Sequence, residues 1–360
     1  MNAATPTRIR WILVVCITFI AAIFFVDRVN VSIARASIAL DYHLSDVQLG
    51  KIFSVFYLGY GLFQIPSGWL ADRLGARRTL ALGALWWAVF TTLTAGFPAG
   101  IAQGFLLICS VRFLMGMGES VTFPSSNRWV ANWIPVSERG LANGLIFAGV
   151  GAGSAFAPPL LRYSMVHLGW RVSFWACGAV GLLAAVAWYA TARNHPDQHS
   201  WVNDAERKWI HQGIKQRDAW ENPKLSWATM LGCKDVWWLF VSYFCFGYPP
   251  TIFFTWFFTY LTRERGLNLQ AASYYTMLPF LAMSIGSAVG GWIADIVSRH
   301  FGRRWGRCGV AAFGMVGAGI FIAAALRVST APAASIILAA GAGSLYLAQS
   351  AYWALSADIG

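Results

Sequence analysis

A chain of 360 residues has the length of two soluble domains, but its composition excludes them. Hydrophobic residues make up 57% of the chain and charged residues 12%, about half of the ~25% that is usual in soluble domains. The net charge of +12 would suit a nucleic-acid partner, yet in so apolar a chain it indicates Lys- and Arg-rich loops on one side of a membrane. We therefore expect a multispanning protein of the lipid bilayer that binds no nucleic acid.

Ten apolar stretches follow one another along the chain, each long enough to cross ~30 Å of hydrocarbon as a helix. They run from about 11–35, 47–70, 79–97, 102–124, 140–165, 171–192, 235–261, 270–296, 308–326 and 333–357. These runs are rich in Ala, Leu and Gly and lack period-two alternation, which favours helices over strands. The first run resembles a signal peptide, but the nine spans behind it indicate that it stays in place as helix 1.

Basic residues gather in alternate loops, beginning with the N-terminus. Arg73, Arg77 and Arg78 follow the second span, and the long polar segment 193–234 holds further ones. The positive-inside rule makes the N-terminus and this segment cytoplasmic, as in a multi-pass protein of the cell (inner) membrane. Within the segment, the run from Asn203 to Ile210 predicts a short capped helix that lies along the membrane surface.

The polar segment divides the spans into six and four. We predict an N-terminal six-helix bundle at 1–192, a cytoplasmic central loop at 193–234 and an incomplete C-terminal bundle of helices 7–10 at 235–360. A second half that matched the first would need two more helices. We therefore expect a truncated twelve-span protein, whose form ending at Gly360 transports poorly by itself; the coding DNA past codon 360 would decide this point.

The motif G-W-(L/I)-A-D occurs twice, at 68–72 and at 291–295. Both copies end the second helix of a half, and such parallel repeats are typical of one large transporter class. The run from Gly68 to Arg78 resembles the signature loop of the major facilitator superfamily, G-x-x-x-D-R-x-G-x-R-R. In the second copy, Ile296 stands where the signature has a basic residue.

This resemblance implies an all-α membrane protein with the major facilitator fold of two six-helix bundles, here truncated to about ten transmembrane helices. It also implies a cytoplasmic latch that opens and closes during alternating access. The residues predicted to form this latch are Gly68, Asp72, Arg73, Gly75, Arg77, Arg78 and, from the second copy, Asp295.

Two further motifs are similar to those of the anion:cation symporter family within that superfamily. They are Asp27-Arg28 in helix 1 and the run from Arg112 to Glu119 in helix 4, which continues into Phe123-Pro124-Ser125-Ser126-Asn127-Arg128. The family includes importers of hexuronates, galactonate and glucarate, and carriers of phthalate and lysosomal sialic acid. The resemblance implies a monomeric proton-coupled symporter of an organic anion such as a sugar acid, without enzymatic activity, cofactor or metal.

Asp27 and Glu119 are the only two of the 15 acidic residues that lie well inside apolar runs, and Arg28 and Arg112 accompany them. Placing a charge at the bilayer centre costs about 2.5–3.5 kcal/mol of free energy on insertion scales. The presence of four such residues therefore indicates that they have a function. We predict that Asp27, Glu119 and Arg112 couple transport to protons, because a proton on each carboxylate leaves two positive charges that can receive an anion. The alternative is a pair of ion pairs that joins helix 1 to helix 4.

Arginine is suited to bidentate recognition of a carboxylate, and the family resemblance assigns this role to Arg28. Tyr60 and Gln64, four residues apart on helix 2, occupy family positions that bind sugar-acid hydroxyls or carboxylate; hydrogen bonding between helices is the alternative. Helix 7 offers Tyr243 and Trp256 as further binding residues. Its aromatic character favours a flatter or more aromatic anion than galactonate.

Other functions stay open as alternatives. An integral-membrane enzyme would need clustered His or paired carboxylates, and the sequence contains no GxSxG, HExxH or Walker motif. A channel would not require the twofold repeat. Within the superfamily, the nearest alternative is an exporter or antiporter of another small molecule, such as an aromatic acid or a drug.

Glycine pairs at GxxxG spacing occur at Gly149/Gly153 in helix 5 and Gly286/Gly290 in helix 8. This spacing predicts close helix packing. The alternative is that helices 5 and 8 slide against helices of the opposite half during transport.

Overall fold

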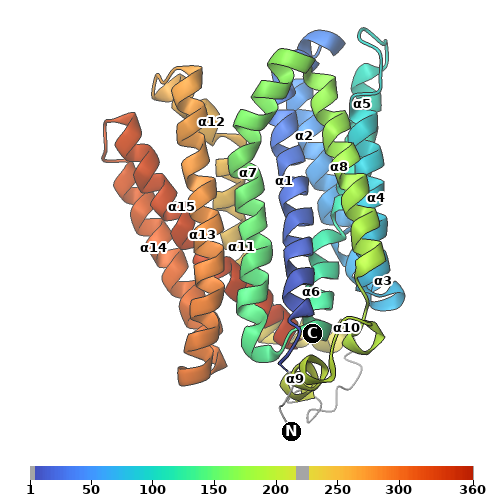
Figure 1. Cartoon of the computed structure of the whole chain (residues 1–360). Coiled ribbons are helices and arrows are strands. Elements are labelled where there is room, and N and C mark those ends of the chain that lie inside the picture. Colours follow the sequence, from blue (N-terminus) through green and yellow to red (C-terminus); the bar gives the residue numbers. More distant parts are fainter. Residues whose placement is uncertain (1–4, 216–226, 360) are drawn as a thin grey trace. The chain divides into compact units, whose positions relative to one another are not determined.

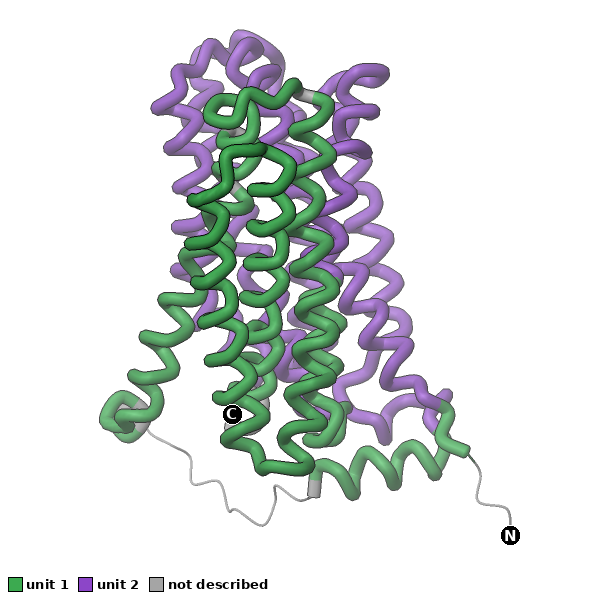
Figure 2. Tube along the Cα trace, turned by 90° about the vertical axis from the view of Figure 1, so that its left-hand side faces the viewer, with its two compact units in different colours: residues 1–7, 134–148, 203–360 green, residues 8–133, 149–202 purple. Residues whose placement is uncertain are grey.

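The computed structural model describes residues 5–215 and 227–359, and every regular element within these ranges is a helix. The chain divides into two compact units, which Figure 2 shows in different colours. Unit 1 comprises Met1–Thr7, Ile134–Ala148 and Asn203–Gly360, and unit 2 comprises Arg8–Trp133 and Gly149–Val202. Each unit is described by itself below. Residues 216–226 of the predicted central loop lie outside the described ranges.

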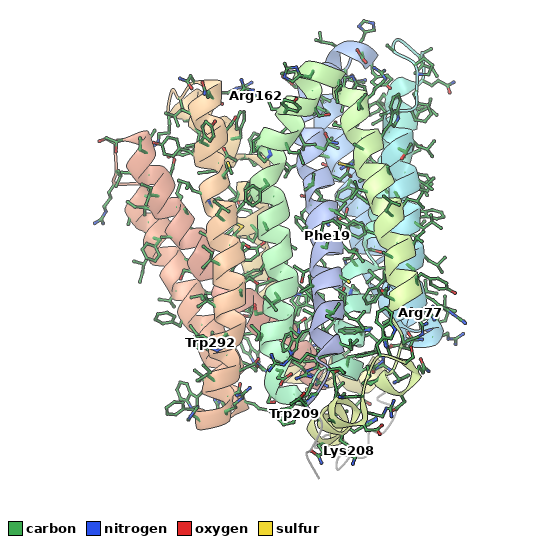
Figure 3. All side chains as sticks on the ribbon, in the orientation of Figure 1. Phe19, Arg77, Arg162, Lys208, Trp209 and Trp292 are labelled. Carbon is green, nitrogen blue, oxygen red and sulfur yellow. The ribbon has the colours of Figure 1, made fainter. Side chains whose placement is uncertain are left out.

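Unit 2 is a bundle of long helices (Figure 1). Its elements are α1 (Ile9–Tyr42), α2 (Asp46–Leu62), α3 (Gln64–Leu74), α4 (Ala76–Thr94), α5 (Gly104–Glu119), α6 (Thr122–Trp133), the part of α7 (Arg139–Leu168) from Gly149 onward, α8 (Trp170–Thr191) and η2 (Pro196–Gln198). Helix α2 packs against α5, α4 against both α5 and α8, and α1 against α8. Phe19, on the outside of α1, is 56% exposed and lies between Arg77 and Arg162 at the two ends of the unit (Figure 3). Exposed apolar side chains of this kind suit a lipid environment.

Unit 1 holds the later helices of the chain (Figure 1). Its elements are η1 (Val136–Glu138), α7 as far as Ala148, α9 (Asp204–Lys215), α10 (Trp227–Gly232), α11 (Lys234–Thr255), α12 (Phe257–Thr259), η3 (Tyr260–Glu264), α13 (Leu269–Phe301), η4 (Trp305–Gly309), α14 (Val310–Ala325) and α15 (Ala331–Ile359). Helix α15 packs along both α13 and α14. The predicted capped helix in the central loop is α9, because the Asn203 side chain accepts a hydrogen bond of 2.9 Å from the backbone N–H of Glu206.

Seven helices of the described residues are long and apolar enough to cross a membrane. They are Ile9–Tyr42, Gly104–Trp133, Val136–Leu168, Trp170–Thr191, Gln270–Phe301, Trp305–Ala325 and Ala331–Ser356. Each coincides with one of the ten predicted spans. The other three predicted spans, 47–70, 79–97 and 235–261, are helical but do not belong to this set.

The predicted helix at 47–70 is in fact two helices, α2 and α3, which meet at Phe63. Pro66 explains the interruption, because proline has no N–H and its ring crowds the carbonyl four residues before it. Backbone hydrogen bonds continue on both sides, from Phe63 N to Gly59 O (3.3 Å) and from Ser67 N to Phe63 O (2.9 Å). The interruption is therefore local. Prolines also lie inside α11, which ends before the predicted span does.

The glycines of α7 lie where this helix crosses α1. A Cβ on Gly149 would stand 2.3 Å from the carbonyl oxygen of Thr18, and one on Gly153 would stand 2.2 Å from that of Ala22. Only glycine allows the two backbones to approach so closely. The predicted packing role holds for this pair, whereas sliding against the opposite half does not, because both glycines contact a helix of their own half.

The glycine pair in α13, Gly286 and Gly290, also packs against the backbone of a neighbouring helix of its own half. A Cβ on Gly286 would stand 2.2 Å from the carbonyl oxygen of Gly343 in α15, and Gly290 faces the backbone of Leu347. Helices α7 and α13 do meet, but at other glycines: a Cβ on Gly291 would stand 2.1 Å from the carbonyl oxygen of Gly140. The close approach of α7 to α13 therefore lies at Gly140 and Gly291 and not at the glycine pairs named from the sequence.

Candidate functional site

Four ionisable side chains lie together inside unit 2. Asp27 and Arg28 come from α1, and Arg112 and Glu119 from α5. Asp27, Arg112 and Glu119 are 0%, 2% and 1% exposed, and the side chain of Arg28 is 14% exposed. Asp27 interacts electrostatically with Arg112 and Glu119, and Glu119 with both arginines. The structure thus gathers into one buried group the four residues that the sequence singled out.

Arg28 is held by one carboxylate and by aromatic rings. Its Nε donates to Oε1 of Glu119 at 2.5 Å. Its guanidinium lies 4.4 Å from the ring centroid of Phe25, 4.6 Å from that of Tyr60 and 5.3 Å from that of Phe56. Such cation–π contacts contribute up to about 2 kcal/mol when they are desolvated. The rings therefore help to hold the guanidinium independently of its carboxylate partner.

Arg112 is bound differently. Its guanidinium lies 4.5 Å from the ring centroid of Phe56, and its Nη1 is 3.2 Å from the Sδ of Met115. It is attracted by Asp27 and Glu119 and repelled by Arg28. Within the described part of the chain, its Nε has no hydrogen-bond partner. The charge of Arg112 is therefore balanced by carboxylates that do not saturate its donors.

Each of the four side chains keeps at least one polar atom unbonded. Oδ2 of Asp27 accepts a long hydrogen bond from Oγ1 of Thr91 (3.4 Å), whereas its Oδ1 forms no hydrogen bond of good geometry among the described residues, although the Trp87 side chain interacts with the carboxylate. Among the same residues, Oε2 of Glu119 and Nη2 of Arg28 also form no such hydrogen bond. Because buried polar atoms nearly always have partners, such a cluster needs an explanation. It offers spare acceptors to protons and spare donors to an anion.

Tyr60 and Gln64 are the two predicted binding residues from helix 2. Tyr60 lies over the Arg28 guanidinium, so the structure brings it to the charged group. Gln64 opens α3, beyond the interruption at Phe63, and is half-buried. The two residues therefore do not share one continuous helix, as their spacing predicted.

The sequence reasoning missed the aromatic residues Phe25 and Phe56. Both follow from helical spacing, because Phe25 precedes Arg28 by three residues and Phe56 precedes Tyr60 by four. An aromatic residue on the same helix face as a predicted binding residue was the available signal.

Tyr243 and Trp256, the predicted binding residues of helix 7, belong to unit 1. The Tyr243 hydroxyl accepts hydrogen bonds from Nε1 of Trp353 (3.0 Å) and from Nε2 of Gln349 (3.4 Å). Trp256 caps the end of α11 and is 64% exposed. Gln349 and Trp353 of α15 were missed, although a polar residue in an apolar run was a signal. Within the described residues, no three His, Cys, Asp or Glu side chains gather closely enough to hold a metal ion.

The first copy of the repeated motif lies at the surface of unit 2. Oδ1 of Asp72 is 3.3 Å from Nε of Arg128, and the two side chains are 63% and 42% exposed. The Arg73 guanidinium lies 4.2 Å from the ring centroid of Trp69. The partner of Asp72 is thus a residue of α6 that the sequence did not include in the latch.

The turn between α3 and α4 depends on Gly75, whose φ of +83° disfavours a side chain. A Cβ there would also stand 2.3 Å from the Asn194 side chain. The Oδ1 of Asn194 accepts the backbone N–H of Arg77 (3.0 Å), and Arg77 donates to the Tyr189 carbonyl through Nε and Nη2 (3.0 and 2.6 Å). These contacts tie the turn to α8. The other two predicted latch residues are Gly68, where a Cβ would stand 3.9 Å from that of Pro124, and Arg78, which is exposed.

The second copy of the motif is buried in unit 1. Asp295 is 4% exposed and caps the start of α7, because its carboxylate accepts the backbone N–H groups of Gly140 (3.0 Å) and Leu141 (2.8 Å). Its Oδ1 also accepts from Nη1 of Arg307 (2.9 Å), a residue of η4 that is 2% exposed. The basic partner that the motif lacks at Ile296 is thus supplied from eleven residues further along the chain.

The two copies predict different effects of the same substitution. Asp295→Asn is expected to lower the free energy of unfolding by about 3 kcal/mol, because it removes the carboxylate charge beside a buried guanidinium. Asp72→Asn, the matched control, is expected to change it by less than about 1 kcal/mol, because its ion pair is exposed. Thermal unfolding midpoints of the purified variants measure both. Equal shifts would contradict the distinction.

The family model described as Major Facilitator Superfamily matches residues 17–359. The Probable sulfoacetate transporter SauU of Cupriavidus necator is 32% identical over 360 residues, which cover 100% of this chain and 82% of that protein. The chloroplastic Ascorbate transporter of Arabidopsis thaliana is 33% identical over 356 residues, and the chain spans only 64% of its length. Transporters named for galactarate/D-glucarate, D-galactonate and hexuronate are also among the relatives.

Solved structures show the same fold. The proton:xylose symporter XylE bound to 6-bromo-6-deoxy-D-glucose matches with a TM-score of 0.75 and 15% identity, over 96% of this chain and 81% of that chain. At this identity the likeness concerns the fold alone. The predicted fold is therefore confirmed, whereas the number of about ten transmembrane helices is not.

Proposed function

Since the chain belongs to the major facilitator superfamily, we propose that it is a secondary active transporter that carries an organic anion together with protons by alternating access. The anion is a sugar acid or a similar carboxylate. Relatives named for sulfoacetate, galactarate, D-galactonate and hexuronate support an anionic substrate. Proton coupling is supported by the charged group of α1 and α5.

The observation that carries this proposal is the balance of charge and bonding in that group. Two carboxylates and two guanidiniums cancel when all are ionised, and each side chain retains a polar atom that forms no hydrogen bond with the part of the chain that the structure describes. A proton on Asp27 and one on Glu119 leave a net charge of two at Arg28 and Arg112. A dianion in this position restores neutrality and a monoanion offsets half of the charge, so protons and anion stabilise each other inside the low-dielectric bundle.

The exchange of partners takes place at Arg28. In the structure its Nε is bonded to Glu119, which we assign to the state in which both carboxylates are charged. Once Glu119 is protonated its attraction for the guanidinium weakens, and a substrate carboxylate takes its place on the planar donor fork. Release of the anion reverses the steps, because the freed guanidinium draws Glu119 back to its charged form. Tyr60 lies beside this position and contributes a hydroxyl for the substrate.

We place the N-terminus in the cytoplasm of an inner-membrane protein, from the distribution of basic residues. Asp72 and Asp295 then lie on the cytoplasmic side, where Gly68, Arg73, Gly75, Arg77 and Arg78 complete the latch. The buried cap of Asp295 on α7 supports a gating contact that must break for the cytoplasmic side to open.

The test is uptake into proteoliposomes by the protein expressed from its complete coding sequence. Labelled glucuronate, galactonate, glucarate and phthalate are supplied outside, with and without an inward proton gradient. We expect at least one of them to accumulate above its external concentration only when the gradient is present, and a protonophore to abolish this. Accumulation that ignores the gradient, or gradient-driven export of hydrophobic cations instead, would refute the proposal.

A further inference from the structure

The ring of Phe56 in α2 lies close to both arginines of the charged group. Its ring centroid is 4.5 Å from the Arg112 guanidinium and 5.3 Å from that of Arg28. The side chain is 2% exposed, and its ring is stacked with that of Tyr60 at 6.2 Å between centroids. One aromatic ring is thus shared by two buried cations that come from different helices.

The backbone of Phe56 is in direct contact with α5, the helix that carries Arg112 and Glu119. A Cβ on Gly116 of α5 would stand 2.3 Å from the Phe56 carbonyl oxygen, and one on Gly59 would stand 2.3 Å from that of Phe113. Two glycines, one on each helix, therefore bring α2 and α5 into direct backbone contact. The position of the Phe56 ring relative to α5 is set by this crossing.

The Phe56 ring attracts both guanidiniums and thereby offsets part of the repulsion between them. Arg28 and Arg112 repel each other, and this repulsion is opposed by Asp27 and Glu119 as long as these are ionised. When the carboxylates are neutral, the electron-rich face of an aromatic ring still attracts a guanidinium, and more strongly where water is excluded. Tyr60 and Phe25 contact the Arg28 guanidinium, and Phe56 contacts both cations.

We propose that Phe56 is a positioning residue of the anion site, which holds Arg28 and Arg112 together as a two-cation receptor while the carboxylates are neutral. This inference rests on the proposed function. An aliphatic residue of similar size fills the space but lacks the π-face, so the doubly protonated site becomes less stable. The anion then binds more weakly, and the carboxylates take up protons only at lower pH.

The test compares Phe56→Leu, Phe56→Tyr and Phe174→Leu. Phe174 of α8 is also buried, at 0% exposure, but packs against Trp170 and not against the arginines, so its variant reports the loss of packing alone. The probe is whichever of glucuronate, galactonate, glucarate and phthalate the unaltered protein takes up best. Its KM, its maximal rate and the external pH of half-maximal uptake are measured in proteoliposomes.

For Phe56→Leu we expect KM to rise about five- to thirtyfold and the half-maximal pH to move downward, with the maximal rate within about twofold of the unaltered protein. Phe56→Tyr retains the ring and stays close to the unaltered values. An unchanged KM and pH profile in Phe56→Leu, or the same changes in Phe174→Leu, would overturn the inference. If Phe56→Leu does not yield folded protein, Phe56→Met takes its place and is judged by the same two outcomes. Absence of uptake by the unaltered protein would instead contradict the proposed function.

Discussion

Replacement of Arg28 by lysine is expected to reduce anion uptake at low substrate concentration by about ten- to a hundredfold. Lysine keeps the positive charge, so Asp27 and Glu119 remain compensated and the bundle remains folded. It loses the planar fork that binds a carboxylate through two parallel hydrogen bonds. A hydrogen bond to a charged group contributes about 1.5–3 kcal/mol, and about 1.4 kcal/mol corresponds to a tenfold change in affinity.

The chain offers a matched control two turns further along α1. Arg35 is bonded to Asp46 at 2.5 Å, but the two side chains are 40% and 83% exposed. Arg35→Lys makes the same chemical change at the edge of the unit and is expected to alter uptake by less than about twofold. Initial rates in proteoliposomes and elution profiles of the purified variants measure function and folding. Equal losses in both variants, or no loss in Arg28→Lys, would count against Arg28 as the anion clamp.

Replacement of Glu119 by glutamine is expected to remove one of the two coupled protons from the transport cycle. The amide is close to the carboxylate in size and can still accept the hydrogen bond from Arg28, but it cannot take up and release a proton. One pH unit corresponds to 1.36 kcal/mol, so each coupled proton supports about tenfold accumulation per unit of gradient. We therefore expect the accumulation ratio to fall about tenfold at a gradient of one pH unit.

Exchange of labelled for unlabelled anion across the membrane, without a gradient, separates this effect from a general defect. Glu119→Gln is expected to retain exchange with a weaker dependence on pH, because the state that binds the anion then requires a proton on Asp27 but no longer one at position 119. Asp46→Asn is the control, since Asp46 is an exposed carboxylate also paired with an arginine. Full gradient-driven accumulation by Glu119→Gln would rule out Glu119 as a coupling residue.

Particular residues show how far the site could be predicted from the sequence. Asp27, Arg28, Arg112 and Glu119 stood out because charges are rare and costly inside apolar runs. Which arginine binds which carboxylate was left open, because Glu119 shares a helix face with Arg112 but is bonded to Arg28. Helical spacing places side chains on one helix; it does not determine the point at which a second helix crosses it.

The second copy of the motif shows the same difference between what spacing within one helix predicts and what contacts between helices decide. The repeated motif points to Asp295, and the next residue, Ile296, is not basic. The structure supplies Arg307 and the first N–H groups of α7 as its partners. These partners lie 12 and about 155 positions away along the chain, and only the packing of α13 against the start of α7 brings them together.

The amino-acid sequence alone determined that this chain lies in a membrane and that its spans are helical. It also determined that four charged residues lie inside these spans, where their cost indicates a function. Those properties depend on local composition and on spacing within a single helix. The tertiary structure decided the pairing of Arg28 with Glu119, the sharing of Phe56 by two guanidiniums and the burial of one motif copy but not the other. Each of these depends on where two helices touch, which is set by small residues such as Gly116 and Gly140 at the crossing points.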